Sequence, residues 1–241
     1  MEPFIQLKNT PIKEIVISAS FEENLSDELI DNFKNKFVAA TDYIDLGRGF
    51  TANFRQEKKG LPQTSIEVDG FIFKNDKNKV VNLRRGRVAL HKINGYENFE
   101  ELKKEFISIF DILLTVVDKD IKLNNLGLRY LNLFEIQKQE NIEDVLTISV
   151  QSSFEFDTKH KSNIKLIFEK CNEENTSATI STNEIAKDGI NGIILDIQTN
   201  RAFFDSIFSK NFIEKEMEDL RYLKNTLFFK SVTEKTIEKY K

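Results

Sequence analysis

The stretch at residues 94–136 constrains the fold more than any other part of this sequence. In its first half, apolar residues recur at steps of three and four, which places them on one face of a helix. They are Phe99, Leu102, Phe106, Ile109, Leu113 and Val117. The charged residues Glu100, Lys103 and Asp111 are expected on the opposite face. An apolar face of this length needs a covering layer, so the helix is predicted to pack against the centre of the protein.

Both ends of this helix carry recognisable signals. Asn98 is suited to cap the start, and Glu101 follows three residues later, where a capping box requires an acidic side chain. Residues 124–127 read Asn-Asn-Leu-Gly and supply turn chemistry. Residues 128–136 are apolar on both alternating faces, which predicts a strand buried on both sides in the centre of a sheet.

Upstream of this stretch, the sequence predicts a strand, a helix and a loop. Residues 13–21 alternate as a half-buried strand does. Ser26 is a good cap for a helix whose apolar stripe continues to Phe37. Residues 42–64 lack a sustained period, so they are predicted to form a long loop with a short strand at 50–54.

Two strands are expected next, at residues 65–74 and 79–93, with a polar hairpin turn at 75–78 between them. Together with the long helix and the strand at 128–136, they complete the order strand, helix, strand, strand, helix, strand. This is the order of the split βαβ or ferredoxin-like pattern. The N-terminal half is therefore predicted to be βαββαβ-like.

From residue 145 the pattern changes to strands joined by short polar turns, which predicts an antiparallel four-stranded meander. The expected strands lie at 146–157, 163–170, 176–185 and 192–200. Residues 203–229 are predicted to be helical, and a last helix is expected to begin at Ser231, with Glu234 completing a capping box. The sequence thus predicts an α+β protein with a mainly antiparallel sheet. Its predicted core contains Ile17, Phe33, Phe106, Ile109, Leu113, Tyr130, Phe134 and Leu195.

Composition limits the domain organisation and the partners. With only 9 Gly and 3 Pro in 241 residues, no flexible linker is apparent, which favours one unit over 1–241. A subdivision into 1–137 and 138–241 is the alternative. The net charge of -4 gives no overall attraction to nucleic acid, which is not an expected partner. A single cysteine, and no apolar run long enough to cross a bilayer, lead us to expect a cytoplasmic protein without membrane contact.

The strongest local charge feature is the basic run Arg84, Arg85, Gly86 and Arg87, followed by His91. If residues 79–93 form one strand, alternation places Arg85, Arg87 and His91 on one face and Arg84 on the other. Neighbouring guanidinium groups can hold a phosphate or carboxylate through paired hydrogen bonds. The sequence therefore offers this run as a candidate anion site.

The alternative interpretation of the basic run is structural. Its charges could protect an edge strand from aggregation, or pair across strands with Glu67 and Asp69. The same question applies to Arg129, since an unpaired guanidinium in a buried strand is costly. Glu135, Glu14 and Asp69 are its candidate partners, and a structural ion pair is favoured over a ligand clamp.

No other residue pattern indicates catalysis. His91 and His160 lack the spacing of a metal site. Cys171 is followed closely by Glu173 and Glu174, whose charge is expected to raise the thiol pKa and make a nucleophile improbable. Because no nucleotide-binding or hydrolase motif occurs, we expect no catalytic residues, no metal and no cofactor.

Four stretches together carry a family resemblance: PIKEI at 11–15, GYENFEEL at 95–102, LGLRYLNLFEI at 126–136 and LFFKSVTEKTIEKY at 227–240. They resemble a sporadically distributed family of uncharacterised prokaryotic proteins of unknown function. The resemblance spans most of the chain in the same order and implies no particular activity, substrate or catalytic residue. Sporadic distribution implies horizontal transfer, as is common for mobile-element and phage-defence genes.

Two hypotheses for function remain open at this point. The first is a non-enzymatic binding or interaction module that contacts a partner protein or a second copy of itself, as an accessory component of a mobile or phage-defence locus. The second is an anion- or nucleotide-binding sensor or hydrolase. Its site residues would be Arg84, Arg85, Arg87, His91 and Arg129. A third, weaker hypothesis is an apolar pocket between the sheet and the Phe-rich helix, as in helix-grip ligand binders.

Overall fold

The computed structural model describes residues 4–55, 63–95, 98–118, 120–137, 140–148, 163–171, 175–187 and 190–241. Its strands are β1 (Ile12–Phe21), β2 (Ile44–Arg55), β3 (Gln63–Lys74), β4 (Lys79–Arg84), β5 (Arg87–Ile93), β6 (Lys122–Glu135), β7 (Asn163–Phe168), β8 (Thr176–Lys187) and β9 (Ile190–Ile207). Its helices are α1 (Asp27–Ala40), α2 (Phe99–Val117), α3 (Ile142–Val145), α4 (Lys210–Ser231) and α5 (Glu234–Tyr240).

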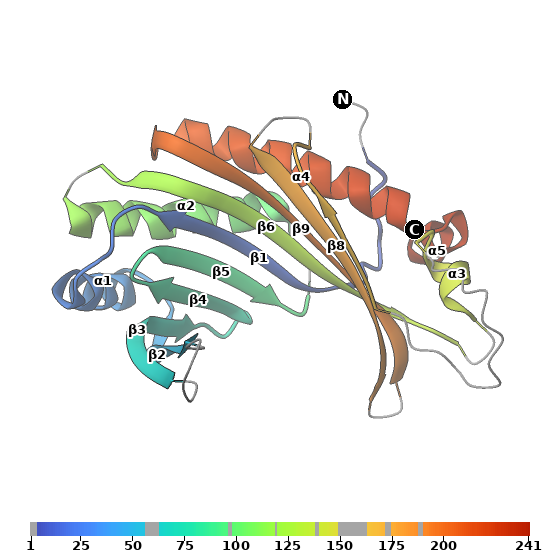
Figure 1. Cartoon of the computed structure of the whole chain (residues 1–241), viewed down its shortest axis with the longest axis horizontal. Coiled ribbons are helices and arrows are strands. Elements are labelled where there is room, and N and C mark those ends of the chain that lie inside the picture. The colour runs from blue at the N-terminus through green and yellow to red at the C-terminus, as the bar shows by residue number, and fades with distance from the viewer. Residues whose placement is uncertain are drawn as a thin grey trace.

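The strands described here form one nine-stranded antiparallel sheet in the order β2-β3-β4-β5-β1-β6-β9-β8-β7 (Figure 1). The α+β class with an antiparallel sheet is as predicted. The N-terminal half departs from the predicted βαββαβ order, since four strands and not two separate α1 from α2. Strands from both parts of the chain pair at the centre, where β6 lies between β1 and β9.

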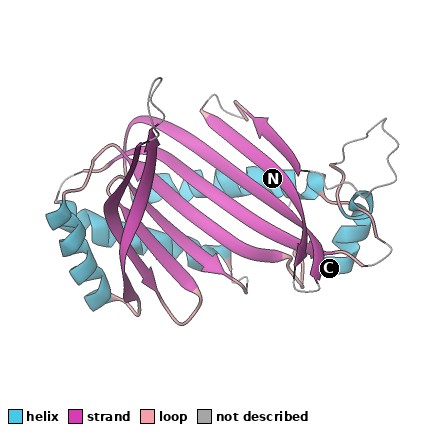
Figure 2. Ribbon diagram, turned by 60° about the horizontal axis from the view of Figure 1, so that its bottom comes forward, coloured by secondary structure: helices cyan, strands magenta, loops and turns pink. Residues whose placement is uncertain are grey.

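The sheet has one covered and one open face. Helices α1, α2 and α4 contribute buried residues to the main core, together with the inward-facing residues of the strands. On β1 those residues are Ile15, Ile17, Ala19 and Phe21, which are at most 3% exposed. Figure 2 looks onto the other face of the sheet, with α2 and α4 running behind it. The eight core residues predicted from the sequence are all buried.

Local signals set the starts of α1 and α2 at the predicted residues, although Asn98 caps α2 through its own side chain and not in a capping box with Glu101. Ser26 accepts a hydrogen bond from the N–H of Leu29 at the start of α1. Asn98 likewise accepts from the N–H of Glu100 at the start of α2. None of the described helices is both long and apolar enough to cross a membrane.

Pairing between strands overrides several local predictions. Residues 44–55, predicted mostly as loop, form a full strand because they pair with β3 along their length, with register shifts that absorb Gly47 and Gly49. Residues 79–93 are two strands, since the chain turns at Arg85 and Gly86. The predicted turn at 124–127 lies inside β6, which is buried on one face and only half-buried on the other.

The C-terminal half also differs from prediction. Strand β9 continues through residue 207, so the helix predicted from 203 begins only at Lys210. Ser231 ends α4, and Thr233 caps the last helix. Strands β7, β8 and β9 are neighbours in chain order, as a meander requires. Most of the strand predicted at 146–157 lies outside the described residues.

Candidate functional site

A row of small side chains forms the floor of a hollow on the open face of the sheet. The row crosses four strands through Asn82, Ala89, Ser18 and Gly127, each the register partner of the next. A Cβ at Gly127 would lie only 2.8 Å from the Asn200 amide oxygen and 3.1 Å from the Ser18 hydroxyl, so glycine lets these side chains approach the strand. The resulting cavity has a volume of about 490 Å³.

Two arginines line this cavity at one end of the floor. Arg84 and Arg87 are direct partners across the β4–β5 hairpin, which places both side chains on the open face. The Arg87 guanidinium donates to the Ser18 hydroxyl at 3.2 Å. Among the described residues, neither arginine has a carboxylate within 4.0 Å. Like charges directly opposite one another on a sheet are destabilising, and the two side chains diverge, Arg87 toward Ser18 and Arg84 toward Gly49.

Arg84 carries a further cost, because part of its guanidinium is buried without a partner. Its side chain extends over β3 toward β2, where a Cβ at Gly49 would lie 2.6 Å from Nη1. Within the described part of the chain, neither this Nη1 nor the nearby Asn82 Oδ1 has a hydrogen-bond partner. A buried donor left unsatisfied costs about 1 to 3 kcal/mol. Asn82 and Arg84 both line the cavity, but this Nη1 is directed toward β2, away from the floor that β4, β5, β1 and β6 form.

At the other end of the floor, two basic side chains already have acidic partners. His91 Nδ1 lies 2.8 Å from Glu14 Oε1. Arg129 makes two hydrogen bonds to Asp196, from Nε at 2.9 Å and from Nη2 at 2.6 Å. The hydrogen bond with His91 lowers the pKa of Glu14, and the one to Asp196 raises the pKa of Arg129. These pairs orient the imidazole and the guanidinium at the far end of the cavity.

Arg129 is therefore in a structural ion pair, as favoured from the sequence, but its partner is none of the three candidates. Asp196 lies on β9, two residues from the register partner of Arg129. The pairing of β6 with β9 joins segments about 67 residues apart, which local pattern does not reveal.

Arg85 does not belong to the site, contrary to prediction. Because the chain reverses at Arg85 and Gly86, Arg84 and Arg87 face the same side, while Arg85 points toward the start of α1. Its guanidinium donates to the Leu25 carbonyl at 2.9 Å and to Asp27 at 2.5 Å. The site thus retains Arg84, Arg87, His91 and Arg129 of the five predicted residues.

The composition of this cavity suits an anion better than a metal ion. Its lining contains three arginines and one histidine, and no aspartate or glutamate among the described residues. In the described part of the chain, no group of three His, Cys, Asp or Glu side chains could hold a metal. Burial raises the pKa of the Cys171 thiol, and His160 lies outside the described residues.

The pair of Glu14 and His91 should make stability depend on pH in the acid range. The folded state lowers the Glu14 pKa below its usual 4.5, so its stabilising contribution is complete above that pH and is lost as the pH falls through the lower, folded value. We expect the stability difference between wild type and Glu14→Gln to shrink as pH falls from about 5 to about 3. Urea unfolding at several pH values measures it.

The variant His91→Phe provides the control, because the hydrogen bond with His91 is the largest cause of the lowered pKa. In a protein that carries His91→Phe, adding Glu14→Gln should change the pH dependence of stability much less than it does in wild type. A stability difference between wild type and Glu14→Gln that stays constant over this range would contradict the assignment.

Comparison of the chain with protein-family models, with curated proteins and with solved structures finds no match.

Proposed function

We propose that the protein is a non-enzymatic binding module that holds a small anionic compound, a phosphate or a carboxylate, in the cavity on the open face of its sheet. One observation carries the proposal. Arg84 and Arg87 line this cavity, and among the described residues neither has a carboxylate partner. An anion would offset the positive charge that the two arginines bring to this end of the cavity.

The dimensions of the cavity support a ligand larger than a single inorganic ion. Arg87 and His91 are four residues apart on β5, which corresponds to about 13 Å along the strand. A compound with an acid group near Arg87 would extend over the floor of Ala89, Ser18 and Gly127 toward the oriented His91 ring. Charge-assisted hydrogen bonds from arginine contribute about 1.5 to 3 kcal/mol each.

Binding is favoured over hydrolysis because the groups at the far end of the cavity are held in pairs. His91 is engaged by Glu14 and Arg129 by Asp196. The one hydroxyl among the described lining residues, that of Ser18, is engaged by the hydrogen bond from Arg87. The contact with a partner protein and the place in a mobile or phage-defence locus stay predictions from the sequence.

Isothermal titration with inorganic pyrophosphate tests the proposal. Wild type should bind it, and Arg87→Gln and Arg84→Gln should each weaken the affinity by about 10- to 100-fold, the loss of one charge-assisted hydrogen bond. Arg85→Gln is the matched control, since it removes the same charge from the same hairpin but its side chain points to α1. Its affinity should equal that of wild type.

Stability of the same variants separates a binding role from a structural one. Because Arg84→Gln removes a buried donor without a partner, it should unfold at the same urea concentration as wild type or higher. The proposal fails if wild type binds neither pyrophosphate nor citrate at constant salt. It also fails if Arg85→Gln weakens binding as much as the other two, because binding would then follow net charge alone. Release of orthophosphate during the titration would show hydrolysis instead.

A further inference from the structure

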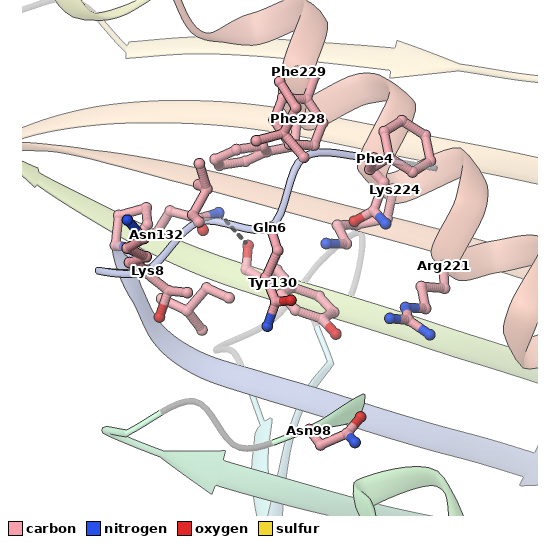
Figure 3. Close-up of a pocket in the computed structure, with 16 residues that line it drawn as sticks. Phe4, Gln6, Lys8, Asn98, Tyr130, Asn132, Arg221, Lys224, Phe228 and Phe229 are labelled. Atoms are coloured by element: carbon pink, nitrogen blue, oxygen red, sulfur yellow. Dashed lines mark hydrogen bonds between the residues drawn. The ribbon is translucent and has the colours of Figure 1, made fainter. Parts of the chain in front are cut away.

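A second cavity, of about 640 Å³, lies on the helix-covered side of the sheet (Figure 3). Its walls are α4, the start of α2, the strand β6 and the N-terminal segment at residues 4–12. It is separated from the arginine cavity by the sheet itself, since Tyr130 and Arg129 are neighbours on β6 and point to opposite faces.

Lys224 is the unusual residue of this cavity. It is only 7% exposed, and its Nζ lies 3.8 Å from the centre of the Tyr130 ring. Figure 3 shows Lys224 and Arg221 reaching from α4 toward Tyr130. Among the described residues, none accepts a hydrogen bond from the Lys224 amine and none forms an ion pair with it. A charged amine in such a place is costly unless an anion accompanies it.

The other charged residues of the cavity do not supply the negative charge that the Lys224 amine lacks. Lys8 and Arg221 also line the cavity, and no described lining residue is an aspartate or glutamate. Arg221 is already compensated, because it contacts Glu100 at 3.1 Å and Glu218 at 3.4 Å. Burial, together with the nearby Arg221, lowers the pKa of Lys224 to about 7. An acid group that enters the cavity would therefore pair with the Lys224 amine.

The rest of the cavity offers aromatic surfaces. Phe4 stacks on Phe229, with ring centres 5.5 Å apart and planes within 6°. Phe228 and the face of Tyr130 complete this lining. The N-terminal segment is tied in place, since the Lys8 N–H donates to the Tyr240 carbonyl at 3.0 Å. A flat apolar group can pack on such rings while a polar end meets the amine.

We propose that this cavity is a second binding site, for a small organic acid whose carboxylate or phosphate group pairs with the Lys224 amine and whose aromatic body packs against Phe4, Tyr130 and Phe228. This site is distinct from the arginine cavity in location and in chemistry. No Phe or Tyr is among the described residues that line the arginine cavity, whereas this one combines a buried, unpaired amine with aromatic rings.

Titrations followed by amide chemical shifts test this proposal with four probes: benzoate, phenyl phosphate, benzamide and inorganic phosphate. Benzoate or phenyl phosphate should bind in the millimolar range expected of a fragment, and the tighter of the two identifies the acid group. Benzamide has the ring without the charge, and inorganic phosphate has the charge without the ring. Both should bind at least about 10-fold more weakly than the better acid.

Two lysine variants locate the site. Lys224→Met should reduce the affinity for the better acid by about 10- to 100-fold, because it removes the paired charge. Lys230→Met is the matched control, since Lys230 is exposed on the same helix and does not line the cavity. Lys224→Met is expected to fold, because it replaces a desolvated amine with an apolar side chain of similar length.

Three results would overturn the proposal: no binding of either aromatic acid to wild type, equal binding of benzamide, or unchanged affinity in Lys224→Met. Inorganic phosphate binding as tightly as the aromatic acids would overturn the assignment of an aromatic body. Arg87→Gln should leave benzoate binding unchanged, so the two sites succeed or fail independently.

Discussion

Replacing Phe110 with alanine is expected to lower the free energy of unfolding by about 3 to 5 kcal/mol. The Phe110 side chain on α2 is fully buried. Its ring stacks on Phe208, with centres 4.3 Å apart, and meets the edge of Phe21 at 6.2 Å. Phe208 directly follows β9, and Phe21 is the last residue of β1. The Phe110 ring therefore joins α2 to two segments that are distant in sequence, and its removal leaves a cavity between them.

Urea unfolding followed by circular dichroism measures this loss. The matched control is Phe204→Ala, which makes the same substitution at a residue 83% exposed and should change stability by no more than about 0.5 kcal/mol. A loss below about 1 kcal/mol for Phe110→Ala would show that α2 is not packed against the sheet as described.

The second large effect is expected at a buried ion pair between β9 and α4. Arg201 and Glu216 are both nearly inaccessible and form a direct hydrogen bond. The Arg201 Nε also donates to the Thr176 hydroxyl at 3.0 Å, and Asp219 lies 3.5 Å from Nη1. Replacing Glu216 with alanine leaves a buried guanidinium with only partial compensation. The free energy of unfolding should fall by about 3 to 5 kcal/mol. The fall is smaller if Asp219 moves closer to Arg201 and takes over part of the pairing.

A double variant distinguishes the loss of the pair from the loss of one partner. When Arg201→Met is combined with Glu216→Leu, no charge is left buried, and most of the stability should return. The same unfolding measurement applies to both. If Glu216→Ala and the double variant are equally unstable, packing rather than uncompensated charge explains the effect. A cost below about 1 kcal/mol for Glu216→Ala would contradict the burial of the pair.

The candidate anion site shows how far local pattern reaches. The sequence singled out Arg84, Arg87, His91 and Arg129, and the structure places all four around one cavity. The sequence also singled out Arg85, which the structure directs away from this cavity because the chain turns at residues 85 and 86. In a single strand, alternation would place Arg85 and Arg87 on one face. The turn interrupts this alternation, so that Arg84 and Arg87 share a face instead.

The Lys224 cavity had no signal in the sequence. A lysine in an amphipathic helix is ordinarily solvated, and the mixed charges of residues 210–231 fit that interpretation. Lys224 is buried because the N-terminal segment crosses over α4 and β6, a contact between residues more than 200 positions apart. Lys103 is a similar case, since it was expected on the exposed side of α2 but is buried beside Glu218 of α4.

The sequence by itself determined the features that depend on near neighbours. The alternation around Ile17, the stripe through Phe106 and the caps at Ser26 and Asn98 were all correct, because side-chain direction along a strand or helix repeats within a few residues. Tertiary structure alone decided the length of β2, the partner of Arg129 and the burial of Lys224. Each of these depends on which distant segment pairs or packs against the residue, and local periodicity does not encode that choice.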